Sequence, residues 1–203
     1  MPDFLKMGIV LMLVGMVATA VLAMTESATR APIAEAKRQE TLRILKSVLP
    51  EGFDNEPDVD TVTFADKRLN RREKPVTFYR GRKGATNLGV AFVVTAPDGY
   101  SGDIELMMSV NPDGSINLVQ VVSHAETPGL GDKIVKTDWP LAFKGKTQEN
   151  VKWGVKKDGG DFDQFAGATI TPRAVVAAVK RGLDFFVEKK EAIFQPATGE
   201  KKP

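Results

Sequence analysis

Residues 163–172, DQFAGATITP, combine a hydroxyl, a glycine and a helix start in a way that could bind an anion. Gly167 leaves the backbone uncrowded, and Thr169 places a hydroxyl beside it. Thr171 is of a type that caps helix N-termini, and Pro172 suits the first helical position. A helix N-terminus offers free N–H groups and a positive dipole end, which favour phosphate. From the residues alone, the segment is either an anion site or an ordinary helix cap.

A second motif, HAETPGLGDKI at residues 124–134, precedes the first. Pro128 and Gly129 predict a turn, and Gly131 allows another sharp bend. His124 is the single histidine of the chain, and a lone histidine is more often structural than catalytic. Without other information, this motif predicts a surface loop.

The composition excludes several kinds of chemistry. The chain has no cysteine and one histidine, so it cannot form disulfides, thiolate-ligated iron–sulfur clusters, a cysteine nucleophile or a histidine-rich metal site. It lacks the glycine-rich dinucleotide and Walker motifs. The net charge is +2 with basic residues scattered among acids, so nucleic acid is not an expected partner. Any redox chemistry must therefore come from a bound organic cofactor.

Taken together, the two motifs resemble the FMN-binding domain family. Residues 163–169 are similar to its flavinylation motif, an Asp followed by Ser/Thr-Gly-Ala-Thr, with Asp163, Gly167, Ala168 and Thr169 at the matching positions. Ala166 departs from that pattern, because the family usually has Ser or Thr there. Residues 126–131 are similar to the Glu-Thr-Pro-Gly-Leu-Gly loop of the same family.

The resemblance implies that a flavin transferase joins the phosphate of FMN to the Thr169 hydroxyl, and that the 124–134 loop folds over the flavin. Thr171 is the competing hydroxyl, and we expect it to cap the helix instead. Lys133 could face the phosphate. We expect neither a catalytic residue nor a metal ligand. The expected FMN-binding residues are Thr169, Glu126, Thr127, Pro128, Gly129, Leu130, Gly131, Lys133, Gly167, Ala168, Ile170 and Thr171.

Residues 7–24 form an apolar stretch within an uncharged segment between Lys6 and Glu26. As a helix the stretch would span about 27 Å, close to the hydrocarbon thickness of about 30 Å. We expect a retained transmembrane anchor. The alternative is a signal peptide whose cleavage site ends at Ala23, although the amino-terminal region carries little positive charge.

The rest of the pattern predicts an α+β fold, with helices packed on an antiparallel sheet and one N-terminal transmembrane helix as a tether. A helical stretch opens at Ala31 and stops at Pro50, and the last helix runs from Pro172 to about Glu188. Strand patterns cover residues 76–79, 88–95, 104–110 and 116–122, with a hairpin turn at 111–114 and a short strand near Val62. The expected divisions are an anchor (1–30), a connecting helix with an irregular segment (31–75), the FMN-binding domain (76–195) and a flexible tail (196–203).

Over nearly its whole length the chain resembles the G-type flavin subunits of Rnf complexes, the ion-translocating ferredoxin:NAD⁺ oxidoreductases. This implies a covalent-FMN electron-relay subunit, not a complete enzyme, in a complex that couples electron transfer to Na⁺ or H⁺ transport. It also implies other membrane and iron–sulfur subunits as partners, lipid around the anchor, and a flavin domain on the periplasmic side of the inner membrane. The alternatives are the related C-type subunit of a Na⁺-translocating NADH:quinone reductase, an anchored structural subunit with no redox role, and a free-standing flavin reductase.

Overall fold

The structure is a computed structural model that describes residues 2–195, so the predicted tail at 196–203 lies outside the described residues. The chain divides into two compact units, residues 1–43 and residues 44–203. Helix α1 (Asp3–Val48) supplies nearly all of the described part of the first unit and the beginning of the second. Within the described residues, it is the one helix long and apolar enough to cross a membrane.

The predicted helix start at Ala31 is wrong, because α1 continues through this point with Pro32 inside it. A proline removes its own N–H donor and crowds the preceding turn. It leaves the helical bonds further along on either side intact, and here α1 extends to Val48.

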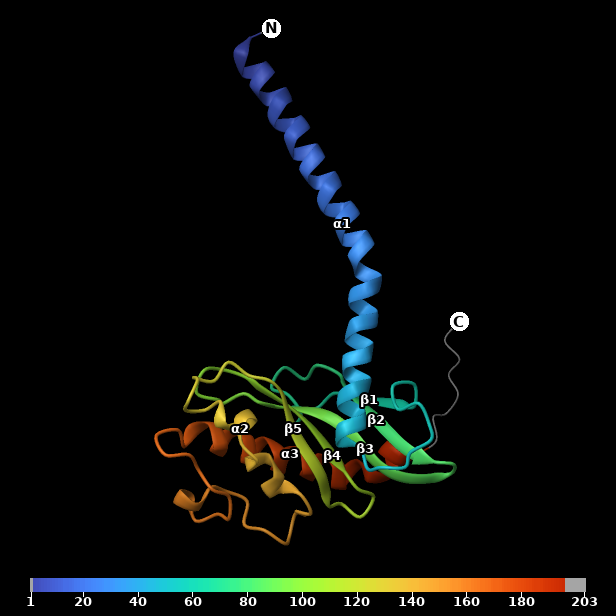
Figure 1. Cartoon of the computed structure of the whole chain (residues 1–203), viewed down its shortest axis with the longest axis vertical. Coiled ribbons are helices and arrows are strands. Elements are labelled where there is room, and N and C mark those ends of the chain that lie inside the picture. The colour runs from blue at the N-terminus through green and yellow to red at the C-terminus, as the bar shows by residue number, and fades with distance from the viewer. Residues whose placement is uncertain (1, 196–203) are drawn as a thin grey trace. The chain divides into compact units, whose positions relative to one another are not determined.

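The second unit is built on an antiparallel sheet (Figure 1). Within the described residues it has five strands in the order β1-β2-β3-β4-β5, so each strand pairs with its neighbour in sequence. The predicted α+β fold is confirmed, as are the predicted strands, although the strand predicted at 76–79 continues to Lys83. The strands are β1 (Thr61–Phe64), β2 (Val76–Lys83), β3 (Thr86–Ala96), β4 (Ile104–Val110) and β5 (Ile116–Ser123).

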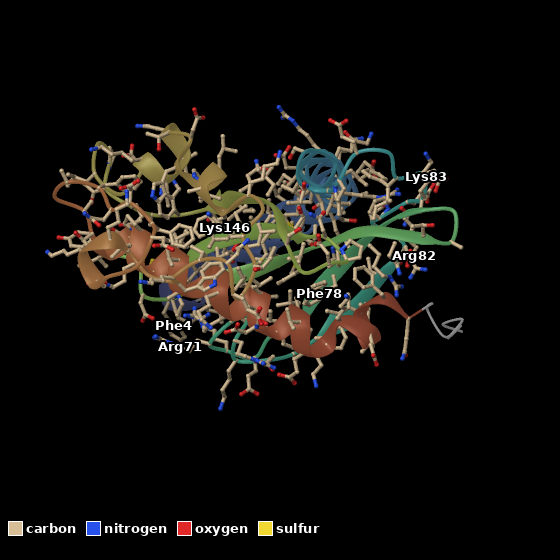
Figure 2. All side chains as sticks on the ribbon, turned by 90° about the horizontal axis from the view of Figure 1, so that it is seen from below. Phe4, Arg71, Phe78, Arg82, Lys83 and Lys146 are labelled. Atoms are coloured by element: carbon tan, nitrogen blue, oxygen red, sulfur yellow. The ribbon has the colours of Figure 1, made fainter. Side chains whose placement is uncertain are left out.

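The two faces of the sheet are covered by different elements, because successive side chains of a strand point to opposite faces. Helix α3 (Ile170–Phe194) covers one face, as Figure 1 shows, and packs against the larger core cluster. In that cluster Phe78, labelled in Figure 2, stacks on Phe92 and also contacts Phe185 of α3. On the other face, the last turn of α1 buries Leu45 and Val48 in a smaller cluster with Ala91 and Met107.

Two observations assign residues before 76 to the second unit. Strand β1 pairs with β2, and Leu69 is fully buried in the larger core cluster. The connecting region is therefore partly structured as sheet and core. The remaining short elements lie after the sheet in sequence and are α2 (Lys133–Lys136) and the 3₁₀ helices η1 (Trp139–Phe143) and η2 (Lys156–Asp158).

An ion-pair network joins the loop before β2 to α3. The Arg68 guanidinium donates to Asp66 at 3.0 and 2.9 Å and to Glu188 of α3 at 2.6 Å. The side-chain hydrogen bond from Arg68 lowers the pKa of the Asp66 carboxyl below its ordinary value. Because the folded pKa is below the unfolded one, this interaction stabilises the fold above about pH 4, and the stabilisation is lost as the pH falls through the folded pKa.

We therefore predict that Asp66→Asn lowers the stability of the protein near neutral pH by about 0.2–1 kcal/mol, the range of partly exposed ion pairs. The measurement is the thermal midpoint in detergent from pH 7 down to pH 2, with Asp103→Asn, at an exposed carboxylate, as the control. The variant and the parent should converge in acid. A difference that persists at pH 2 would mean that Asp66 acts through packing instead of charge.

Candidate functional site

A cavity of about 130 Å³ lies at the N-terminus of α3. Three segments that are distant in sequence line it, namely the loop between β3 and β4, the loop after β5, and the turn that precedes α3. Its lining residues are Tyr100, Glu126, Thr127, Leu130, Gly131, Gly167, Ala168, Thr169, Ile170 and Thr171. The fold thus brings both sequence motifs to one place, although Pro128, Gly129 and Lys133 do not line the cavity.

The turn that precedes α3 is compact and braced. The Ala168 N–H donates to the Phe165 carbonyl at 3.1 Å, and Gly167 between them has a φ of 76°, which favours glycine. The Trp139 indole N–H donates to the Asp163 carbonyl at 2.7 Å, and its ring packs edge-on against Phe165. These contacts fix the backbone on both sides of the turn and so set where Thr169 stands.

The structure distinguishes the two threonine hydroxyls of this segment. Thr169 is the N-cap residue of α3, yet its side chain makes no capping hydrogen bond. Thr171 is 1% exposed, and its hydroxyl donates to Glu126 Oε2. The predicted capping role of Thr171 is therefore wrong. Its hydroxyl is used by a carboxylate from the other motif, and α3 begins at Ile170 instead of at Pro172.

Glu126 joins the three segments around the cavity. The Ser101 N–H donates to its Oε1 at 2.9 Å, while Thr171 bonds its Oε2, and the residue is only 5% exposed. A Cβ at Gly131 would stand 2.6 Å from Oε2, and one at Gly99 would stand 2.9 Å from Oε1. Both glycines are therefore needed for space, because any side chain there would push the buried carboxylate out of its position.

The loop after β5 folds back on itself. The N–H groups of Leu130 and Asp132 donate to the Thr127 carbonyl at 3.2 and 3.4 Å. The Asp132 carboxylate is 2.5 Å from the Lys136 ammonium, whose hydrogen bond lowers the pKa of the Asp132 carboxyl. At the start of the loop, the Glu126 N–H donates to Nδ1 of His124 at 3.1 Å, which gives this histidine a structural role.

Three large hydrophobic side chains are exposed at the rim of the cavity. Tyr100, Leu130 and Ile170 are 68%, 42% and 45% exposed, and each comes from a different lining segment. Such a surface suits a flat aromatic group. Tyr100 is not among the residues predicted from the sequence, although an isolated aromatic residue among the small residues of GYSG, positions 99–102, is a signal that could have identified it.

The charge of the site is unusual for one that receives a phosphate. Glu126 is the one charged residue among the lining residues, which include neither lysine nor arginine. Positive potential comes instead from the N-terminus of α3, a helix of 25 residues. Among residues 2–195, no cluster of three or more His, Cys, Asp or Glu side chains is arranged to hold a metal ion.

Two family models match parts of this chain. Residues 99–184 match the FMN-binding domain family, and residues 3–48 match the RnfG N-terminal region. The G subunit of the ion-translocating oxidoreductase complex of Pseudomonas aeruginosa strain PAO1 is 43% identical over 201 residues, covering 96% of this chain and 94% of the relative. The protein of the same description from Pseudoalteromonas atlantica is 41% identical over 195 residues, covering 93% and 91%.

Among solved structures, the crystal structure of Shewanella oneidensis NqrC matches this chain with a TM-score of 0.49 and 24% sequence identity. The match covers 68% of this chain and 75% of that one.

Proposed function

The chain belongs to the family of G subunits of ion-translocating oxidoreductase complexes, and we propose that it relays electrons through an FMN esterified to Thr169. Its membership makes it an FMN-binding subunit of an electron-transport complex, anchored to a membrane by α1. One observation supports the assignment of the FMN attachment to Thr169. Thr169 lines the cavity without a capping bond, whereas the hydroxyl of Thr171 is buried and bonded to Glu126.

The residues present fit a tethered flavin better than an enclosed one. The cavity of about 130 Å³ is well below the roughly 300 Å³ at which ligand pockets begin. It has room for the phosphate end of FMN beside Thr169, and its rim of Tyr100, Leu130 and Ile170 offers apolar contact to the ring. A flavin held in this way keeps one side open to a partner, as a relay requires.

When bound, FMN supplies the electron-accepting and electron-donating chemistry. The contribution of this chain is to attach and orient the cofactor. In a step carried out by a flavin transferase, the Thr169 hydroxyl would lose its proton and its oxygen would bond to phosphorus, while the phosphoanhydride bond of an activated FMN donor breaks and the other phosphate of that donor leaves. Gly167 lets the backbone turn sharply there, and the bond from Trp139 to the Asp163 carbonyl keeps that turn in place. No side chain of the site is required to act as a catalyst.

Ion movement is assigned to partner subunits. The apolar part of α1 contains no ionisable residue between Lys6 and Glu26, and ion paths through membranes use polar or charged groups. We propose that the second unit lies on the periplasmic side of the inner membrane and exchanges electrons with other membrane and iron–sulfur subunits. These partners would couple electron flow to Na⁺ or H⁺ transport.

The attachment is tested on the purified full-length chain, produced with and without a flavin transferase. The expected result is a fluorescent band after denaturing electrophoresis, together with an intact mass increased by one esterified FMN, only when the transferase is present. A chain that is isolated from its native membrane without covalent flavin would contradict the proposal.

The location is tested with a membrane-impermeant amine reagent applied to intact spheroplasts. The lysines of the second unit, such as Lys144 and Lys180, should react before lysis, while those of a cytoplasmic marker protein should not. Labelling of this unit only after lysis would place it inside the cell and reverse the proposed electron route.

A further inference from the structure

The cavity lacks the cationic side chains that often hold a free phosphate. Phosphate sites usually direct arginine or lysine side chains at the anion. Here the lining residues include neither. Two cations that lie near the site in sequence are committed elsewhere, because Lys136 pairs with Asp132 at 2.5 Å and Arg173 pairs with Asp158 at 2.6 Å.

Among the groups that line the cavity, which do not include Lys133, the N-terminus of α3 is the remaining attraction for an anion, and a carboxylate already contacts its first turn. Glu126 accepts a hydrogen bond from Thr171, which lies in the first turn of this helix. Both carboxylate oxygens accept hydrogen bonds, since Oε1 receives the Ser101 N–H. Among the described residues, Glu126 forms no ion pair with a basic side chain, and its two oxygens are held by the Ser101 N–H and the Thr171 hydroxyl.

We infer that Glu126 makes this site reject free FMN and accept the flavin only as an ester. The inference rests on the proposed attachment at Thr169. A phosphate monoester carries about 1.5 to 2 negative charges at neutral pH, as a phosphorylated side chain does, whereas a diester carries one. The buried carboxylate repels the monoester more strongly than the diester. The covalent bond then holds the flavin at a site where its noncovalent affinity is low. An immature chain therefore keeps Thr169 accessible to the transferase, because unattached FMN does not fill the site.

The test uses full-length Thr169→Val protein in detergent, which cannot be esterified at this position. Dissociation constants are measured for FMN and for riboflavin, which has the same ring and sugar chain but no phosphate. Riboflavin should bind at least as tightly as FMN. Adding Glu126→Gln should tighten FMN binding by about tenfold or more and leave riboflavin binding within about twofold, because charge repulsion at short range is worth at least that factor.

Two further variants separate charge from loosening of the loops. Thr171→Val removes the hydroxyl bond but keeps the carboxylate, so the ratio of FMN affinity to riboflavin affinity should stay unchanged. Leu130→Lys adds a cation at the exposed rim without touching the buried contacts, and it should favour FMN alone when compared with Leu130→Gln. If Glu126→Gln does not fold, the comparison of FMN with riboflavin on the Thr169→Val parent still decides the inference.

The inference is overturned if the Thr169→Val parent binds FMN more tightly than riboflavin. It is equally overturned if Glu126→Gln leaves the ratio of FMN affinity to riboflavin affinity unchanged, or if it alters the affinity for both flavins alike. Failure of the proposed attachment has a separate signature, namely wild-type protein without covalent flavin. The binding ratios are measured on chains that carry no ester and are independent of that result.

Discussion

Thr169→Val protein is expected to lose all covalent flavin fluorescence, while Thr171→Val and Thr171→Ser proteins retain it. Valine has the shape of threonine without the hydroxyl, so the substitution removes the acceptor oxygen and little else. Thr169 makes no capping hydrogen bond, so no existing contact of that kind is broken. The signal, read on a denaturing gel and by intact mass, should therefore fall to the background of the unmodified chain.

The Thr171 variants provide the matched control, because that hydroxyl lies two residues further along the same segment. Thr171→Val leaves Glu126 Oε2 without its donor, and an unsatisfied buried acceptor costs about 1–3 kcal/mol. The protein should be less stable but still modified, whereas Thr171→Ser should be close to the parent in both respects. Fluorescent Thr169→Val protein, or the loss of flavin in Thr171→Val but not in Thr171→Ser, would show that the acceptor has been assigned to the wrong residue.

The sheet could be predicted from the sequence because its signals are local. Apolar runs at 88–95 and 104–110 and the Asn-Pro-Asp-Gly turn after them mark strands and a hairpin regardless of tertiary contacts. The structure has β3 at Thr86–Ala96 and β4 at Ile104–Val110, so only the ends of the first of these strands differed. Each strand pairs with the next in sequence, which is the simplest antiparallel order.

The details of the site depended on contacts between distant residues, which local patterns do not contain. A threonine before a proline predicts a helix cap, but the Thr171 hydroxyl bonds a carboxylate 45 residues earlier in the chain. That contact is specified jointly by Glu126, by the space at Gly99 and Gly131, and by the sheet that brings the loops together. Without the fold, the two motifs could be recognised as related to one cofactor, but their hydrogen bonding could not be derived.

For the same reason, the sequence alone did not identify Arg80 as the most buried charged residue among those that the structure describes. Arg80 lies on β2 and is 1% exposed, yet by sequence it comes directly after the strand predicted at 76–79 and is followed closely by other basic residues. Its guanidinium is 2.5 Å from Asp60 and donates through Nη1 to the carbonyls of Ile193 and Gln195 at 3.3 and 2.5 Å. These carbonyls are at the C-terminal end of α3, where helices leave acceptors without intrahelical partners.

We predict that Arg80→Met lowers the stability of the second unit by about 3–5 kcal/mol, the usual cost of breaking a buried ion pair from one side. Methionine fills much of the space of the arginine stem but can neither form an ion pair with Asp60 nor donate hydrogen bonds to the α3 carbonyls. Arg82 also bonds Asp60, at 2.8 Å, so the loss should lie toward the lower end of this range. The measurement is chemical unfolding followed through the two tryptophans of the chain.

A matched surface pair shows whether burial is the cause. Arg71 and Asp98 are 2.7 Å apart with both side chains about two-thirds exposed, and Arg71→Met should cost no more than about 1 kcal/mol. The double variant Arg80→Met with Asp60→Asn should lose less than the sum of the single losses, because neither charge is then left without the other. Additive losses, or equal effects at Arg80 and Arg71, would mean that the buried guanidinium does not hold the end of α3.

Since the cavity lies at the opposite end of that helix, covalent flavin should persist in Arg80→Met protein that remains folded. This result would separate the stabilising role of Arg80 from the chemistry at Thr169.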